Sequence, residues 1–144
     1  MAGNRTFAMI KPDAFEAGKG GRILAHVEQA GYLIRAMRLV RLTRTEAEAF
    51  YKVHRERPFF EELVSFMSSG RAIALTLEKD DAVAAWRATI GATDPGEAAS
   101  GTIRKLFAES KGRNAVHGSD SDDNAAREIA FFFPERELAI LGSG

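Results

Sequence analysis

The chain has 144 residues, of which 45% are hydrophobic and 28% are charged, and this length and composition predict one domain, residues 1–144, with a buried core. Twenty basic residues balance twenty acidic ones, which argues against non-specific nucleic-acid binding, because such binding depends on an excess of positive charge. The absence of cysteine excludes disulfides, thiolate zinc sites and cysteine nucleophiles.

The first part of the chain predicts a strand, a helix and a second strand. The apolar run 6–10 ends at a Lys-Pro pair and predicts a short buried strand. A glycine-rich turn at 18–21 precedes a helical apolar stripe, which Gly31 ends. Residues 32–42 predict a long strand, one face of which is expected to carry Ile34, Ala36, Val40 and Leu42.

The middle of the chain predicts two helical segments, a third strand and a further helix. A capping box at 45–48 indicates where the first of these helices begins, and a second helical segment follows at about 58–70. Alternating apolar residues at 73–77 predict the third strand. The next helix is expected to be capped by Asp80 or Asp81.

The last part of the chain predicts a loop, a short fourth strand and a helix. Residues 92–113 show weak periodicity with several glycines and a proline, and a loop of this length is usually functional or mobile. Residues 115–117 predict the short strand, and 119–122 offer several N-cap candidates for the helix after it.

This order of elements indicates an α+β fold. We expect a ferredoxin-like (βαββαβ) antiparallel four-stranded sheet with helices packed on one face and a long loop insertion before the fourth strand.

His117 is the most informative candidate for chemistry, since it follows a short apolar run and stands just before a helix start. Much of its imidazole is unprotonated near neutral pH, so a ring nitrogen could attack phosphorus without a separate strong base. Gly118 is expected to leave room for a bulky reactant, and a helix N-terminus just beyond would favour phosphate oxygens. The alternative is a structural histidine at a strand end.

The string Asn-Ala-Val-His-Gly-Ser-Asp-Ser at 114–121 resembles the active-site signature of nucleoside diphosphate kinases. The resemblance extends from about residue 6 to residue 133, because four other segments match blocks of that family in the same order. These segments are Thr6–Ala14, Tyr51 with Arg57–Phe60, Gly91–Pro95, and Gly101–Arg104.

The resemblance implies that His117 is the nucleophile, phosphorylated by a nucleoside triphosphate and then discharged onto a diphosphate in a ping-pong reaction. Glu128 matches the family glutamate that accepts a hydrogen bond from the far imidazole nitrogen, with a solvated helix glutamate as the alternative. Ser119 matches a hydrogen-bonding neighbour of this pair, and Tyr51 is expected near the transferred group.

The resemblance also implies a set of nucleotide ligands. Phe59 matches the aromatic residue on which the base stacks, and stacking tolerates purines and pyrimidines alike, with ribose or deoxyribose. Lys111 departs from the family, because many relatives have an aliphatic residue there. The expected ligands are Lys11, Phe59, Leu63, Arg87, Thr93, Arg104 and Asn114, and Lys11 is also expected to reach the transferring phosphate.

The implied cofactor is Mg²⁺, held mainly by nucleotide phosphates and reached by Asp120 through water, although Asp120 and Ser119 could instead be helix caps. The implied partners are nucleoside di- and triphosphates, with ATP as the usual donor, and copies of this chain in a tetramer or hexamer built from dimers.

Other partners are not expected. No specific nucleic acid is anticipated, and no stretch approaches the roughly 20 apolar residues that cross a membrane, so we expect a cytoplasmic protein. Two other functions stay open on the sequence, a regulatory module that senses nucleotides or binds DNA, and transfer from His117 to protein targets.

Overall fold

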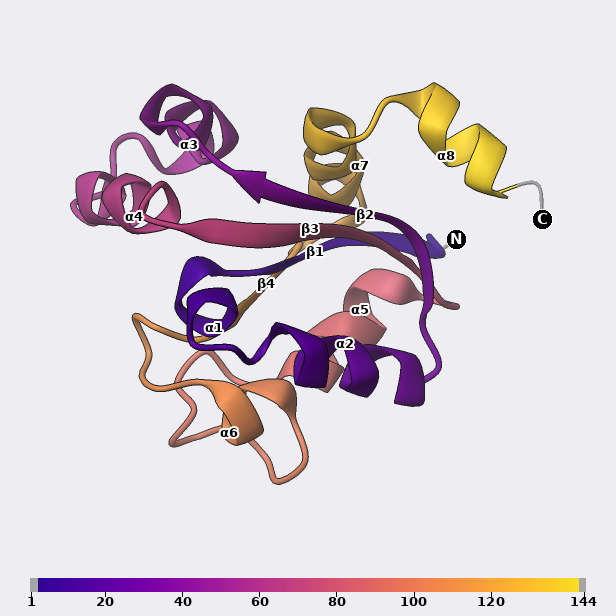
Figure 1. The fold of residues 1–144 in the computed structure, drawn as a ribbon, viewed down its shortest axis with the longest axis horizontal. Helices are drawn as coiled ribbons and strands as arrows, with labels where there is room; N and C mark the ends of the chain where they lie inside the picture. Colours follow the sequence, from indigo (N-terminus) through magenta and orange to yellow (C-terminus); the bar gives the residue numbers. More distant parts are fainter. Residues whose placement is uncertain (1–2, 143–144) are drawn as a thin grey trace.

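A four-stranded antiparallel sheet forms the centre of the computed structural model, which describes residues 3–142, without the side chains of 139–142 (Figure 1). Its spatial order, β2-β3-β1-β4, is that of two interleaved βαβ units and confirms the predicted ferredoxin-like class. The strands are β1 (Arg5–Ile10), β2 (Leu33–Arg41), β3 (Arg71–Glu78) and β4 (Val116–Gly118).

Helices cover both faces of this sheet, so the expectation of helices on one face is wrong (Figure 1). One face packs against α3 (Arg44–Phe50), α4 (Phe60–Met67), α7 (Asp122–Phe132) and α8 (Glu135–Gly142), with the 3₁₀ helix η1 (Lys52–His54) between α3 and α4. The other face packs against α1 (Pro12–Glu16), α2 (Gly20–Gln29), α5 (Ala82–Ile90) and α6 (Ile103–Phe107).

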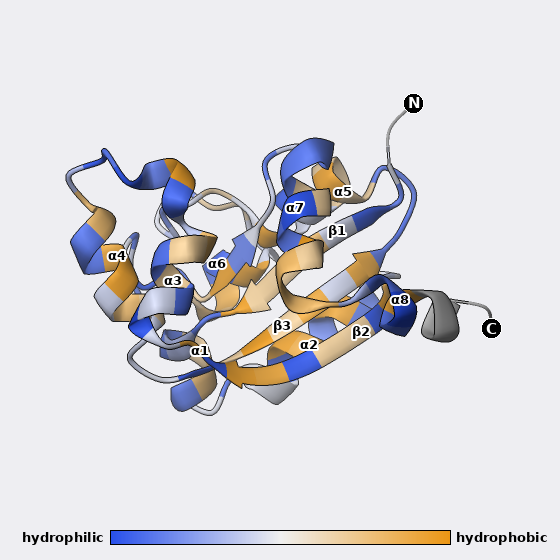
Figure 2. Cartoon of the chain, turned by 90° about the horizontal axis from the view of Figure 1, so that it is seen from above, coloured by the Kyte–Doolittle hydropathy of each residue, from blue (hydrophilic) through white to orange (hydrophobic). Residues whose placement is uncertain are grey.

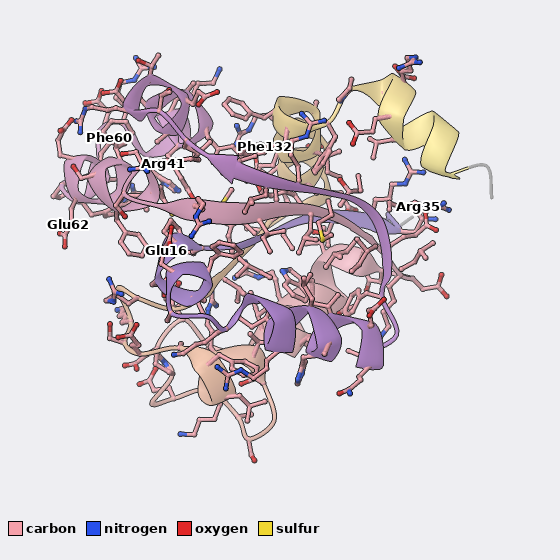
Figure 3. The ribbon with its side chains drawn as sticks, in the orientation of Figure 1. Glu16, Arg35, Arg41, Phe60, Glu62 and Phe132 are labelled. Atoms are coloured by element: carbon pink, nitrogen blue, oxygen red, sulfur yellow. The ribbon has the colours of Figure 1, made fainter. Side chains whose placement is uncertain are left out.

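The central strands explain why both faces are covered. In β1, Phe7 and Met9 belong to one core cluster, whereas Ala8 and Ile10 belong to the other. Figure 2 shows β3 as hydrophobic along most of its length, and all but its terminal residues are buried. A strand with apolar side chains on both faces needs a helical layer on each side.

The expected face of β2 is wrong at one position, because the strand contains a bulge. Ile34 pairs with Leu77, whereas Ala36 pairs with Thr76, so Arg35 is an extra residue in the register. A bulge reverses the alternation of side chains beyond it. Ile34 therefore packs with the α2 and α5 layer, while Ala36, Val40 and Leu42 pack on the opposite face.

Helix α3 begins two residues before the expected position. The capping box joins Thr43 and Glu46, in which Thr43 Oγ1 accepts from Glu46 N at 3.1 Å and Glu46 Oε1 accepts from Thr43 N at 2.9 Å. Both Thr43 and Thr45 have a glutamate three residues later, but the chain leaves the sheet at buried Leu42, so the earlier pair meets the helix start.

The remaining boundaries largely follow the sequence pattern. Asp81 is the N-cap residue of α5, without a side-chain cap bond, and Gly91 ends that helix at φ +86°. Ser121 caps α7, and the long segment before β4 contains the short helix α6. The pattern did not predict α1, α6 or α8. Within residues 3–142, no helix is long and apolar enough to cross a membrane.

Candidate active site

His117 lies in β4, the short edge strand of the sheet, where it pairs with Met9 of β1. Its side chain is 20% exposed, so part of the imidazole faces solvent. Aromatic rings surround the rest, with centroids 5.8 Å away for Phe7 and Phe50 and 6.3 Å away for Tyr51. These edge contacts restrict how the imidazole can turn.

Glu128 of α7 holds the imidazole by one nitrogen. Its Oε1 lies 2.8 Å from Nε2 of His117 and accepts a second hydrogen bond from Oγ of Ser119 at 2.7 Å. Burial alone would raise the pKa of Glu128, but the bonds and charges of His117, Ser119 and Arg127 outweigh it, and the pKa lies below its ordinary value. Because an ionised carboxylate only accepts hydrogen bonds, it selects the neutral tautomer in which Nε2 carries the proton and Nδ1 keeps its lone pair.

This geometry removes two of the alternatives. Glu128 is buried, so it is not a solvated helix glutamate, and Ser119 donates to Glu128, while the cap of α7 is Ser121.

Gly118 does not make space for a reactant, contrary to the expectation from the sequence. A Cβ on this residue would lie 2.8 Å from Cδ1 of Trp86 and 3.1 Å from Cδ1 of Ile90. The indole also donates from Nε1 to the backbone oxygen of His117 at 3.1 Å. The glycine therefore lets β4 pack directly on α5.

Lys11 and Asn114, two of the expected nucleotide ligands, contact each other directly. Lys11 follows β1 and is only 8% exposed, and its Nζ donates to Oδ1 of Asn114 at 2.8 Å. Burial lowers the pKa of the Lys11 ammonium to about 8, an effect that the negative charge of Asp13 opposes and the positive charge of Arg104 increases. A cation is thus held in a poorly solvated place, where it attracts anions strongly.

Arg87, Thr93 and Arg104 line one cavity of about 480 Å³. The Arg104 guanidinium donates to the backbone oxygens of Gly91 at 3.0 Å, Asn114 at 3.3 Å and Val116 at 2.9 Å. Since a guanidinium has five N–H groups, one on each terminal nitrogen is left for an anion. Burial, together with the charge of Arg87, lowers the pKa of Arg104 to about 10, so it stays charged at neutral pH.

The residues expected at the base lie on α4 and the turn before it. Phe59 is 47% exposed, and its ring packs at a tilt against His54, with centroids 5.5 Å apart. Leu63 is half-buried against the core. Tyr51, by contrast, is buried, and burial followed by the charge of Glu128 raises its pKa, so its hydroxyl stays protonated.

Asp120 is exposed at the start of α7, where its Oδ1 accepts from Nδ2 of Asn124 at 2.5 Å. That bond is the main reason why the pKa of Asp120 lies below its usual value, and Ser121, not Asp120, caps the helix. Among the described residues, no group of three or more His, Asp or Glu gathers as a metal-binding cluster. A single ionised carboxylate suits Mg²⁺ that is bound mainly by water and substrate phosphates.

Sequence reasoning missed Asp13, which is buried in the first turn of α1 and accepts a hydrogen bond from Ala115 N at 2.9 Å. The signal available was an acidic residue directly after Pro12, because proline at the first helical position fixes where the next side chain points. The aromatic contacts of Phe7 and Phe50 with His117 were also missed, since these residues look like ordinary core.

The fold and this arrangement, a carboxylate-bound histidine with a buried lysine and a half-buried arginine on neighbouring elements, define an α+β enzyme of the phosphate-transferring class. The sequence model for "Nucleoside diphosphate kinase" matches residues 4–138. The chain belongs to the nucleoside diphosphate kinase family, and it is therefore a transferase that uses nucleotides.

Relatives and solved structures agree with this assignment. Nucleoside diphosphate kinases from Sorangium cellulosum and Flavobacterium psychrophilum are 55% and 56% identical, over 96% and 95% of this chain and 96% and 99% of theirs. The structure of the Aquifex aeolicus enzyme matches with a TM-score of 0.91 at 48% identity, covering 93% of this chain and 97% of that one. A Halobacterium salinarum enzyme in complex with CDP matches with 0.87 at 40% identity, covering 92% and 89%.

Proposed function

We propose that this enzyme transfers the γ-phosphate of a nucleoside triphosphate, usually ATP, to a nucleoside diphosphate through a phosphohistidine on Nδ1 of His117. The observation that carries this proposal is the hydrogen bond between Nε2 of His117 and Glu128. It leaves Nδ1 as the nitrogen with a free lone pair, on a ring that is partly open to solvent.

In the first half of the reaction, the Nδ1 lone pair attacks the γ-phosphorus. An N–P bond forms, the bond from phosphorus to the bridging oxygen breaks, and its electron pair leaves on the β-phosphate of the departing diphosphate. The imidazole gains positive charge as the bond forms, and the Glu128 carboxylate stabilises that charge. In the second half, an oxygen of another diphosphate attacks the same phosphorus and the N–P bond breaks.

Three cations, of which Lys11 is buried, Arg104 half-buried and Arg87 exposed, supply the electrostatic part of catalysis. Lys11 is proposed to contact the transferring phosphate, while Arg87, Arg104 and Thr93 bind the phosphate chain from their shared cavity. Tyr51 would donate its protonated hydroxyl near the transferred group, since its ring packs against His117. Placement of the phosphate between these groups and Nδ1 lowers the barrier mainly through orientation and charge.

The base and the sugar are bound by groups with little base specificity. Phe59 offers an exposed aromatic ring, with Leu63 beside it on α4, and stacking needs only the π-face that every base has. Asn114, together with Lys11, would bind a sugar hydroxyl. This supports broad tolerance of base and sugar, and hence a role in maintaining nucleoside triphosphate pools.

Mg²⁺ is the proposed cofactor, and Asp120 would hold it through water on the nucleotide phosphates. When bound, the ion neutralises phosphate charge. Removal of divalent ions with EDTA should therefore abolish transfer, and added Mg²⁺ should restore it.

We also propose that residues 1–144 form one catalytic domain and assemble as a tetramer or hexamer built from dimers. In support, β2 is an edge strand, and its side chains Leu33, Met37 and Leu39 are each about half exposed. Light scattering after gel filtration tests the assembly. A cytoplasmic location stays a prediction.

The mechanism is tested by incubation with γ-labelled ATP and Mg²⁺. We expect an acid-labile phosphoenzyme that a nucleoside diphosphate discharges, and His117→Ala should lose both the label and the turnover. His26→Ala, a change at the end of α2, is the matched control and should keep them. Parental turnover by His117→Ala contradicts the mechanism.

A further inference from the structure

The backbone just before His117 is held in a strained turn. Ala115 has φ +73°, a value that residues with a side chain rarely adopt, and it is completely buried. The amide of Val116 donates to the oxygen of Asn114 at 2.8 Å, which closes a three-residue turn around Ala115. Such a conformation persists only where the surroundings hold it.

Hydrogen bonds with three neighbouring residues, Lys11, Asp13 and Arg104, hold this turn. The oxygen of Ala115 accepts from the amide of Lys11 at 2.8 Å, and Arg104 donates to the backbone oxygens on either side of it. The amide of Ala115 donates to Oδ2 of Asp13 at 2.9 Å. Lys11 and Arg104 already have proposed roles in nucleotide binding. Asp13 is the one of these three residues that has no role so far.

The carboxylate of Asp13 is unusual because it is buried, with the residue only 5% exposed. Among the described residues, its Oδ1 is buried without a hydrogen-bond partner. This carboxylate lies two residues after Lys11, and its negative charge partly offsets the effect of burial on the pKa of that lysine. Asp13 therefore contacts the turn with one oxygen, and its charge acts on the lysine of the site.

We infer that Asp13 is a positioning residue for phosphate transfer, which holds the Asn114–Val116 turn in place and balances the charge of Lys11. The turn joins Asn114, the hydrogen-bond partner of Lys11, to His117, the residue directly after it. A shift of the turn therefore moves the sugar-binding amide and the nucleophile relative to the cation. This inference rests on the proposed roles of His117 and Lys11.

Two substitutions separate the hydrogen bond from the charge. Asp13→Ala removes both, whereas Asp13→Asn keeps an oxygen that can accept from Ala115 but carries no charge. Asp122→Asn is the matched control, because Oδ2 of Asp122, the exposed first residue of α7, also accepts a backbone amide, that of Gly3 at 3.2 Å. Thermal unfolding of each variant shows that the protein is folded when it is assayed.

The first readout is hydrogen exchange of the Ala115 amide, followed by NMR. We expect this amide to exchange slowly in the parent and in Asp13→Asn, and fast in Asp13→Ala. Slow exchange in folded Asp13→Ala overturns the inference. Because this measurement does not involve catalysis, it judges Asp13 even if His117→Ala were to disprove the phosphohistidine mechanism.

The second readout is kcat/KM as a function of pH, which reports groups of the free enzyme. The groups that face Lys11 are Asp13 on α1, Arg104 on α6, the amide of Asn114, and the ring of Phe66 on α4, over which Arg113 also lies. Loss of the Asp13 charge removes the attraction that raises the pKa of Lys11, while the repulsion by Arg104, which lowers it, remains.

The expected results differ between the two variants. In Asp13→Asn, kcat/KM should begin to fall at a lower pH than in the parent, while in Asp13→Ala it should fall about tenfold or more at every pH, because a buried hydrogen bond to a charged group is lost. Asp122→Asn should match the parent. An unchanged alkaline limb in Asp13→Asn overturns the inference.

Discussion

Nε2 of His117 and Oε1 of Glu128 lie 2.8 Å apart, and Ser119 donates to the same carboxylate oxygen at 2.7 Å. The serine fixes the direction of the carboxylate, and the carboxylate fixes the plane and the tautomer of the imidazole. Because β4 and α7 are separated by only a few residues, this arrangement is formed by one continuous segment of the chain.

Glu128→Gln should slow the formation of the phosphoenzyme about ten- to a hundredfold, because a charge-assisted hydrogen bond contributes about 1.5–3 kcal/mol. The neutral amide can still contact the ring but does not stabilise the positive charge that develops on it. Rapid-quench single-turnover measurement with labelled ATP reports this step. Glu109→Gln, which alters an exposed ion pair with Arg113, should leave the rate unchanged. Equal rates in parent and Glu128→Gln contradict the assigned role.

Lys11→Met should abolish transfer yet stabilise the fold. The folded protein lowers the pKa of this lysine from 10.5 to about 8, and a shift of that size corresponds to about 3 kcal/mol of destabilisation of the charged form, as an upper value. Below pH 8 the lysine is charged in both states, so the full cost is present in the parent. At neutral pH the variant should therefore resist urea unfolding better than the parent.

The stability difference between Lys11→Met and the parent should also depend on pH. Between pH 8 and 10.5 the folded lysine loses its proton while the unfolded one keeps it, so the parent gains stability from this group as the pH rises. The advantage of Lys11→Met should shrink over that range. Lys105→Met, on the exposed surface of α6, should show no comparable gain at any pH. A Lys11→Met protein less stable than the parent at pH 7 would contradict the burial cost.

Much of the fold was predictable because local patterns agree with the final packing. Residues 73–77 alternate as expected, and Gly31 and Gly91 end their helices at positive φ. The bulge at Arg35 was not predictable, because it depends on how β2 is paired with β3 and not on the residues of β2 alone. The second helical layer was not predictable either. The apolar residues on both faces of β1 show that each face needs a cover, but they do not show which helices provide it.

The site was predictable where the chain carries its parts in one short string. Residues 114–121 include the histidine, the serine that fixes its partner, and Asn114. Asp13 is different, since its function depends on an amide about a hundred residues later, which only the folded chain brings near. Gly118 was interpreted wrongly for the same reason, because Trp86 comes from a distant helix.

Gly118→Ala should destabilise the fold by about 1–3 kcal/mol, the usual cost of overpacking a core. The added methyl would lie 2.8 Å from the indole of Trp86, which also donates to the backbone of His117. Displacement of the indole should reduce kcat as well. Gly21→Ala is the matched control, because no atom lies within 4 Å of a Cβ there, in helix α2. It should keep or slightly raise the melting temperature. Equal melting temperatures for the two variants contradict the packing argument.

Phe59→Ala should reduce kcat/KM by a similar factor for purine and pyrimidine nucleotides, because stacking on an aromatic ring is worth about 1–3 kcal/mol for any base. The ring is 47% exposed, so its removal leaves no cavity and should barely change the melting temperature. The loss should appear mainly in KM, since the base lies away from the reacting phosphorus. Val53→Ala removes another exposed apolar side chain of the same region, 58% exposed, and should change neither parameter. A loss confined to one base would show that Phe59 takes part in a specific contact and not in general stacking.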